Sequence, residues 1–316
     1  MEYKILKSKP PLKASALTAI FVFILLLTAI EYKLFLVPNS YNWKCQHLLD
    51  QSEKIECLIL GSSHSYFGIK PDELSLPTYN LANTSQSLGI DTALLKHFIN
   101  RLPRLQFVII PISYLSMEYS ILDSPESWRD CYTLRFLGAC EANWWQVLSN
   151  LKYLSLYSLY GSTKAKELLM QPLPVSVQDI DNNGWFRGIY GGPITPQTAD
   201  ARIKITEQLM NPNHLATNQA HLEEILSLCA HHNIRVIFIT LPAHKYYRDQ
   251  MNKQRWSKAQ SIVNNLSSKY KTIYLDYLKE PHFSTNDFRD NDHLNKQGAT
   301  LLSHMLDKDL TMLIFY

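Results

Sequence analysis

The sequence predicts an α/β protein of the three-layer α/β/α class, with a parallel sheet of about five strands between helices. Two observations favour this class. Short apolar runs, too short for helices, alternate along the chain with longer segments whose apolar residues recur at helical spacing. The order strand, helix, strand also repeats on both sides of one irregular stretch, which indicates parallel strands joined by right-handed crossovers.

The N-terminal region predicts a membrane anchor. Residues 14–30 carry no charge, and with the apolar residues that follow, the segment 14–37 is long enough to cross a bilayer. A cleaved signal peptide is the alternative, but the region around Thr28 lacks a small-x-small cleavage site. Basic residues precede the apolar segment, so we expect a cytoplasmic tail at 1–13 and everything after the anchor outside. These residues are Lys4, Lys7, Lys9 and Lys13.

Residues 38–55 are a polar linker, and the α/β domain is expected at 56–316. An insertion rich in Trp and Tyr interrupts it at about 116–201, and we expect this insertion to cover the edge of the sheet that carries the site. The expected strands are 58–60, 78–82, 105–110, 234–240 and 272–275, and the expected helices are 89–102, 222–231, 248–269 and 296–306.

Charge and cysteine content exclude some classes of function. The net charge is +3 and no basic stripe with interleaved aromatic residues is present, so nucleic acid is not an expected partner. The five cysteines are consistent with export, and Cys131 and Cys140 are spaced to close a small disulfide loop. Cys57 and Cys229 are expected in the core. No Cys/His spacing predicts a metal site, and no cofactor is expected.

Ser63 is the candidate nucleophile. It follows the apolar run 58–60 and the turn residue Gly61, at the edge where parallel sheets bind ligands. A serine needs a base to act as a nucleophile, and His293 supplies one, with Asp290 three residues earlier to orient it. A serine at this position is also a common helix cap, which is the structural alternative. We expect Asp292 to face solvent or to bond nearby backbone.

These residues resemble two sequence blocks of the SGNH/GDSL hydrolases. Gly61-Ser62-Ser63-His64 is similar to their first block, in which Ser63 occupies the position of the nucleophile. Asp290-x-x-His293 is similar to their last block. The resemblance implies a flavodoxin-like sandwich and a Ser-His-Asp triad. Similar Gly-Ser-Ser starts occur in membrane-anchored relatives that modify cell-surface polymers, such as the alginate-acetylation and teichoic-acid D-alanylation proteins.

The resemblance also implies donors for an oxyanion hole. The N–H of Ser63 is one, and the family glycine of the second block matches Ser85. The third block departs from the family pattern, because Ser113 stands where an asparagine is usual. Asn83 is therefore an alternative source of the third donor, as is Gln86.

The segment after the fourth expected strand opens onto the same edge of the sheet. His244, Tyr247 and Arg248 are its candidates for holding an anionic or sugar substrate, and a loop that merely enters a helix is the equal alternative. The function expected from these patterns is serine-dependent acyl transfer or ester hydrolysis, with O-acetyl groups on a cell-envelope glycan as the substrate. A multispanning membrane protein that delivers acyl groups is the implied partner. The alternative is a non-catalytic glycan-binding or assembly protein that retains the fold.

Overall fold

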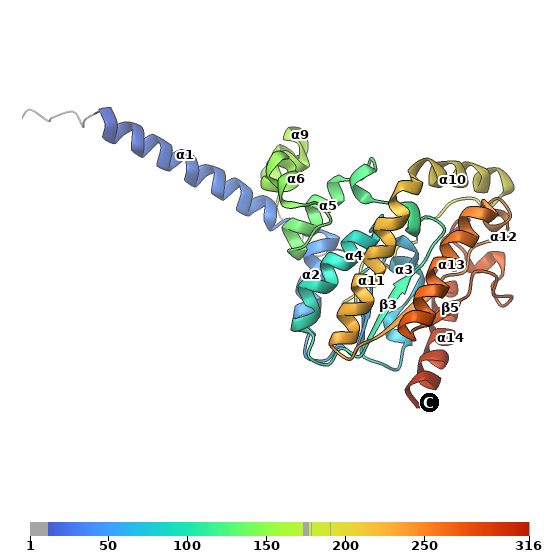
Figure 1. Cartoon of the computed structure of the whole chain (residues 1–316). Helices are drawn as coiled ribbons and strands as arrows, with labels where there is room; N and C mark the ends of the chain where they lie inside the picture. The colour runs from blue at the N-terminus through green and yellow to red at the C-terminus, as the bar shows by residue number, and fades with distance from the viewer. Residues whose placement is uncertain (1–11, 173–176, 178, 190, 316) are drawn as a thin grey trace, which may run out of the picture. The chain divides into compact units, whose positions relative to one another are not determined.

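The computed structural model of the chain describes residues 12–172, 177, 179–189 and 191–315, and a parallel sheet organises its larger part (Figure 1). The strand order is β2-β1-β3-β4-β5, the order of flavodoxin-like sheets, and every neighbouring pair is parallel. The predicted fold class is therefore confirmed. The strands are β1 (Cys57–Ile59), β2 (Thr78–Asn80), β3 (Phe107–Pro111), β4 (Arg235–Thr240) and β5 (Ile273–Asp276).

Helices cover both faces of this sheet. Helices α4 (Leu88–Phe98), α11 (Leu215–His231) and α13 (Lys253–Tyr270) lie on one face, in front of the strands in Figure 1. Helices α3 (Ser63–Gly68) and α14 (Lys296–Phe315) pack against each other on the opposite face. The remaining helices of this part are α2 (Ser40–Asp50), α5 (Trp128–Tyr132), α10 (Pro196–Leu209) and α12 (Lys245–Arg248).

Strands β1, β2 and β3 are wholly buried, and β4 is buried apart from Arg235, whereas the edge strand β5 is only partly buried. Alternate strand residues such as Ile59, Ile109 and Ile237 point to one side, where they pack with Leu302 and Leu306 of α14. Their neighbours along each strand are buried on the other side. At about 25 cal/mol per Å² of apolar surface removed from water, this double burial is the main stabilisation of the sheet.

Helix boundaries differ from expectation where side-chain caps decide them. Helix α13 begins at Lys253 rather than at 248, because its N-cap is Asn252, whose side chain accepts hydrogen bonds from two backbone N–H groups of the first turn. The short helix α12 occupies residues just before this cap. The aromatic insertion also contains regular structure that the sequence did not reveal, above all the helix α10, which Thr195 caps through a reciprocal capping box.

Cys131 and Cys140 are both free thiols in the structure. Cys131 is buried on α5, and the thiol of Cys140 donates a hydrogen bond to the carbonyl of Ala142 at 3.4 Å. Cys57 and Cys229 are buried, as expected. That Cys131 and Cys140 lie close enough to form a disulfide stays a prediction.

The chain divides into two units, one of which contains the apolar N-terminal helix. Unit 1 takes in Met1–Pro38 and Val147–Ser176, and unit 2 takes in Asn39–Gln146 and Val177–Tyr316. Within the described residues, α1 (Leu12–Phe35) is the one helix long and apolar enough to cross a bilayer, over Ala16–Phe35. Most of the predicted tail at 1–13, with Lys4, Lys7 and Lys9, lies outside the described residues. The other helices of unit 1 are α7 (Leu151–Leu154), α8 (Leu156–Tyr160) and α9 (Ser162–Met170).

The turn after β1 tolerates only glycine. Gly61 has a φ of +104°, and a Cβ at this position would lie 1.9 Å from Cγ of Pro111 at the end of β3. We therefore expect Gly61→Ala to lower the free energy of unfolding by about 2–4 kcal/mol, through backbone strain and overpacking. Thermal or urea unfolding measures this loss. Gly192→Ala is the matched control, because no atom lies within 4 Å of its added Cβ. Equal stability of the two variants would contradict this reading of the turn.

Candidate active site

Ser63 is the first residue of α3, at the carboxyl end of the interior strand β1. The N-cap of this helix is Ser62, and its side chain makes no capping hydrogen bond. Ser63 is therefore not a cap, and its hydroxyl points toward another partner. The Ser63 Oγ lies 2.8 Å from Nε2 of His293, at the far end of the sequence. Ser63 lines a small cavity of about 80 Å³ at this edge of the sheet.

A tight turn holds His293 in place. Both carboxylate oxygens of Asp290 lie 3.0 Å from Nδ1 of His293. The same carboxylate accepts the backbone N–H of Asp292 at 3.0 Å and that of His293 at 2.8 Å. One aspartate thus fixes both the ring and the backbone of the residue that contacts Ser63. The sequence-predicted residues Ser63, His293 and Asp290 lie together in this order.

Burial and hydrogen bonding set the charge states of Asp290 and His64, which both lie next to His293. Burial raises the pKa of Asp290, but its hydrogen bonds with the His293 ring and with two backbone N–H groups outweigh burial and lower the pKa below its ordinary value. His64 lies beside His293, with ring centroids 4.8 Å apart. Burial, followed by the nearby charge of His293, lowers the pKa of His64 to about 4. Near neutral pH, Asp290 is ionised and His64 is uncharged.

The environment of the Asp292 side chain differs from the expected one. It is 1% exposed, and its carboxylate accepts hydrogen bonds from Nε and Nη2 of Arg202 at 2.8–3.0 Å. Arg202 lies on α10, inside the aromatic insertion, so a distant segment supplies a cation that draws Asp292 inward. The expectation that Asp292 faces solvent or bonds nearby backbone is therefore wrong. Asp292 Oδ1 lies 3.5 Å from Nδ1 of His293, farther than Asp290.

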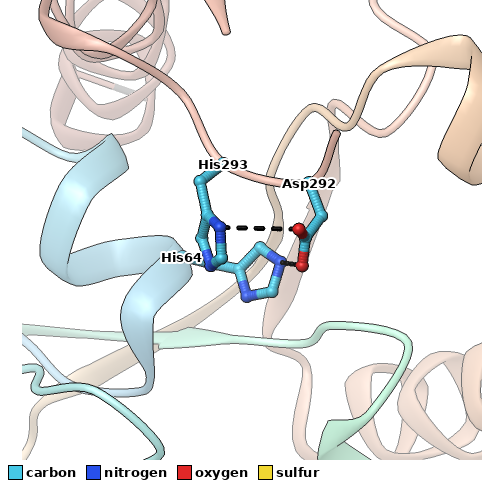
Figure 2. A group of neighbouring side chains, drawn as sticks. All are labelled: His64, Asp292 and His293. Carbon is cyan, nitrogen blue, oxygen red and sulfur yellow. Dashed lines mark ion pairs between the residues drawn. The ribbon is translucent and has the colours of Figure 1, made fainter. Parts of the chain in front are cut away.

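Asp292, His64 and His293 form a group with metal-ligand atoms within 4.8 Å of one another (Figure 2). The two histidine rings converge on the Asp292 carboxylate, which lies 3.7 Å from Nε2 of His64. These donors already have other partners. Arg202 neutralises the carboxylate, and the two ring nitrogens of His293 contact Ser63 and Asp290. The donor set therefore fits an ion-pair and hydrogen-bond network better than a cation site.

Ser63 and Ser85, two of the expected sources of oxyanion donors, line the same cavity. The N–H of Ser63 is at the first turn of α3, where a helix leaves its N–H groups without intrahelical acceptors. Ser85 has a left-handed φ of +58° and lines the same cavity as Ser63. Its carbonyl accepts the hydroxyl of Tyr119 at 3.1 Å, and its own hydroxyl donates to Glu126. The strained residue is thus held from both sides, as functional positions often are.

Of the other three candidate donors, Gln86 lines the cavity, but its side-chain amide donates to Asp91 at 2.7 Å. Asn83 does not line the cavity, because its side-chain amide donates to Ser40 and its side-chain oxygen accepts the N–H of Thr84. Ser113 does line the cavity, but its N–H donates to Oγ of Ser116 at 2.9 Å. The structure therefore brings Ser63, Ser85, Gln86 and Ser113 to one cavity and leaves Asn83 outside it.

The candidate substrate residues after β4 line other cavities. Tyr247 is 4% exposed and packs in an apolar cluster with Tyr114 and Met251. His244 is the N-cap of α12, and Arg248 donates to the carbonyl of Leu278 at 3.3 Å. None of the three lines the cavity that contains Ser63. Their part in substrate binding stays a prediction.

A larger cavity, of about 300 Å³, opens beside His293. The ring of Phe67, which lines it, contacts the His293 ring edge-on with centroids 5.2 Å apart. The guanidinium of Arg289 lies over Phe67, 4.3 Å from its centroid. The wall is both aromatic and cationic. Its side chains are Phe67, Trp185, Phe186, Arg187, Arg289 and Lys296.

Asp91 supports the turn before Ser63 from inside. It is buried on α4, and its Oδ1 accepts the N–H of Gly61 at 2.8 Å and the side-chain amide of Gln86 at 2.7 Å. Burial raises the pKa of Asp91 to about 7, although the two hydrogen bonds act in the opposite direction. Sequence reasoning missed this residue and Arg202. A carboxylate on the apolar face of the segment 89–102 was the available signal for Asp91.

Comparison of the sequence with protein-family models finds no match, and comparison with curated proteins finds none either. The solved structures that match this chain include two at low identity. One is named as an acylhydrolase from Bacteroides fragilis, with a TM-score of 0.41, 11% identity, and coverage of 85% of this chain and 96% of that chain. The other is named as a platelet activating factor from Streptococcus pneumonia, with a TM-score of 0.41, 13% identity, and coverage of 93% and 98%. Similarity at this level carries no argument about activity.

The raised pKa of Asp91 predicts that the stability of the protein depends on pH. Its folded-state pKa of about 7 exceeds the ordinary value of 3.8, so the folded protein binds more protons than the unfolded chain between these values. We expect this group to reduce the free energy of unfolding as the pH rises through that window, by up to about 1.4 kcal/mol per pH unit. Asp91→Asn keeps an acceptor for Gly61 and removes this component. Urea unfolding across the window measures the slope, with the surface variant Asp200→Asn as control. Identical slopes in wild type and Asp91→Asn would refute it.

The ion pair between Arg202 and Asp292 predicts a coupled effect on stability. Asp292→Asn leaves the guanidinium without its countercharge, and because Arg202 is 37% exposed we expect a moderate loss of about 1–3 kcal/mol. Arg202→Met in the Asp292→Asn background should cost less than it does in wild type. A double-mutant cycle by thermal unfolding measures this coupling. Strictly additive effects would mean that the pair does not form.

Proposed function

We propose that this protein transfers acyl groups from esters through Ser63, as a membrane-anchored member of the SGNH hydrolases. One observation carries the proposal: Ser63 Oγ lies 2.8 Å from Nε2 of His293, and Nδ1 of the same ring lies 3.0 Å from both oxygens of Asp290. This is the arrangement of nucleophile, base and orienting carboxylate that activates a hydroxyl near neutral pH.

The proposed reaction has two halves. In the first, Ser63 Oγ attacks the ester carbonyl while Nε2 of His293 takes the hydroxyl proton. The tetrahedral intermediate then expels the alcohol, which receives that proton from His293, and an acyl ester remains on Ser63. In the second half, water or a glycan hydroxyl loses its proton to His293 and attacks the acyl ester. The second tetrahedral intermediate then expels Ser63 Oγ, which takes that proton back from His293. Asp290 stabilises the imidazolium that forms in each half.

The intermediate of each half carries an oxyanion that needs hydrogen-bond donors. In this proposal the N–H groups of Ser63 and Ser85 supply them. Support comes from the shared cavity and from the left-handed backbone of Ser85, which Tyr119 and Glu126 hold in place. Ser113, whose N–H is engaged by Ser116, is the weaker donor.

The proposed substrate is an O-acyl, and in the first instance O-acetyl, ester of a cell-envelope glycan outside the cytoplasm. Support for this location comes from α1 and from the lysines that precede it in the sequence. The aromatic and cationic cavity beside His293 has the size and lining that suit a sugar ring with an anionic substituent. Delivery of the acyl group by a multispanning partner belongs to the same proposal.

A non-catalytic glycan-binding protein, which is the alternative, does not require the geometry of a catalytic site. It has no need for Ser63 and His293 to lie within hydrogen-bond reach, or for Ser63 to line a cavity. Both features are present, so they favour the catalytic proposal.

Turnover of a nitrophenyl ester by the full chain in detergent tests the roles of the three residues. We expect Ser63→Ala and His293→Ala to abolish turnover, and Asp290→Asn to lower it by about 10²-fold or more, because the neutral amide no longer stabilises imidazolium. Each variant should keep its thermal unfolding temperature.

Ser62→Ala is the matched control for Ser63→Ala, because Ser62 is the preceding residue and its Oγ contacts only His64, at 3.4 Å. It should retain most of the turnover. The catalytic proposal fails if His293→Ala keeps the wild-type rate, or if Ser62→Ala is as inactive as Ser63→Ala.

A further inference from the structure

Two charged residues interrupt the apolar helix α1 near its end, and both are used to hold other helices of unit 1. The carboxylate of Glu31 accepts hydrogen bonds from Oγ of Ser155 at 2.6 Å and from the N–H groups of Leu156 and Tyr157 at 2.8 and 3.2 Å. These N–H groups begin α8, where a helix has no internal acceptors for them. Glu31 therefore caps α8.

Lys33 acts at the opposite end of the same group of helices. Its ammonium donates to the carbonyl of Leu169, in the last turn of α9. An acid at a helix start and a base at a helix end both match the helix dipole. Helices α8 and α9 also pack directly on α1. The helices of residues 151–170 are thus attached to the end of the apolar segment Ala16–Phe35.

The attachment fixes the depth of these helices relative to a membrane. If α1 spans a bilayer, Glu31 and Lys33 lie where the hydrocarbon ends and the polar headgroups begin, because buried charges are costly at the centre. Helices α7 to α9 then lie at the same level, next to the headgroups. A surface at this level meets lipid rather than bulk water.

These helices expose several large apolar side chains. Leu148, Leu151, Leu154 and Met170 are all exposed, the last by 86%; we call these four residues the boundary surface. Helix α6 (Trp144–Ser149), which carries Leu148, begins with Trp144 and Trp145, also exposed and stacked with ring centroids 3.6 Å apart. Tryptophan is enriched at the interface between hydrocarbon and water.

Basic residues accompany this apolar surface. Lys152, Lys164 and Lys166 are exposed on α7 and α9, and Glu167 is the acid beside them. Leucine and tryptophan side chains with lysines at their border are the composition of helices that lie in a membrane surface, where the cations meet anionic headgroups. Left in water, so many exposed large apolar side chains on one short segment would be an unusual liability.

We propose that α6 to α9 form a membrane-surface element, which lies in the headgroup region of the bilayer that α1 spans. Its occupant is the lipid surface itself. The boundary surface and the Trp144–Trp145 pair enter the lipid, while Glu31 and Lys33 hold the element at the end of the anchor. This proposal goes beyond the catalytic one and does not use Ser63, so the two can fail separately.

Tryptophan quenching by lipid tests the proposal directly, because α1 contains no tryptophan. The full chain is reconstituted in nanodiscs of phosphatidylcholine and phosphatidylglycerol whose acyl chains are brominated, and its emission is compared with that in unbrominated discs. We expect quenching of roughly a third of the emission, because two of the six tryptophans lie in the interface. Trp144→Phe/Trp145→Phe should abolish the quenching.

The matched control is Trp128→Phe/Trp256→Phe, which removes the tryptophans of α5 and α13 and should leave the quenched component in place. Leu151→Gln/Leu154→Gln should reduce the quenching. Ester turnover in detergent should be unchanged in Trp144→Phe/Trp145→Phe. Equal quenching in wild type and that variant overturns the proposal, because the quenched tryptophans then lie elsewhere in the chain. A chain that does not co-purify with the discs also overturns it.

Discussion

The 2.8 Å contact between Ser63 Oγ and Nε2 of His293 joins residues 230 positions apart, and the rest of unit 2 serves to maintain it. The parallel sheet brings the carboxyl ends of β1 and β5 to one edge. Gly61 allows the chain to turn sharply there against Pro111, and Asp91 holds that turn from below through the Gly61 N–H. A shift of about 1 Å in the position of Ser63 relative to His293 is enough to lower the rate of a serine-dependent acyl transfer substantially.

Local patterns were sufficient to predict the sheet and the contact residues. The apolar run before Gly61 predicts a strand whatever its partners, because three buried residues and a turn glycine leave few alternatives. Asp290 and His293 are three residues apart, so one tight turn determines their relation, and that relation is present in the structure. Such short-range features depend on a few neighbouring dihedral angles, which a sequence specifies well.

Long-range contacts explain what the sequence left open. Arg202 lies 90 residues from Asp292, on a helix inside an insertion whose aromatic content hid its regular structure, so nothing near Asp292 signalled burial. The role of Glu31 and Lys33 was equally hidden, because their partners at 155–157 and 169 belong to a segment that follows three strands of the sheet. Asp91 is the exception: a carboxylate among the apolar positions of one helix was visible in the sequence and went unused.

The central claim is that Ser63 is a nucleophile activated by His293, and covalent labelling tests it most directly. The full chain in detergent is incubated with a fluorophosphonate probe, digested and analysed by mass spectrometry for the modified residue. The account predicts an adduct on Ser63 that is lost in His293→Ala, because the probe reacts only with an activated serine. An unlabelled wild-type protein, an adduct on another serine such as Ser62 or Ser85, or undiminished labelling of His293→Ala would contradict it.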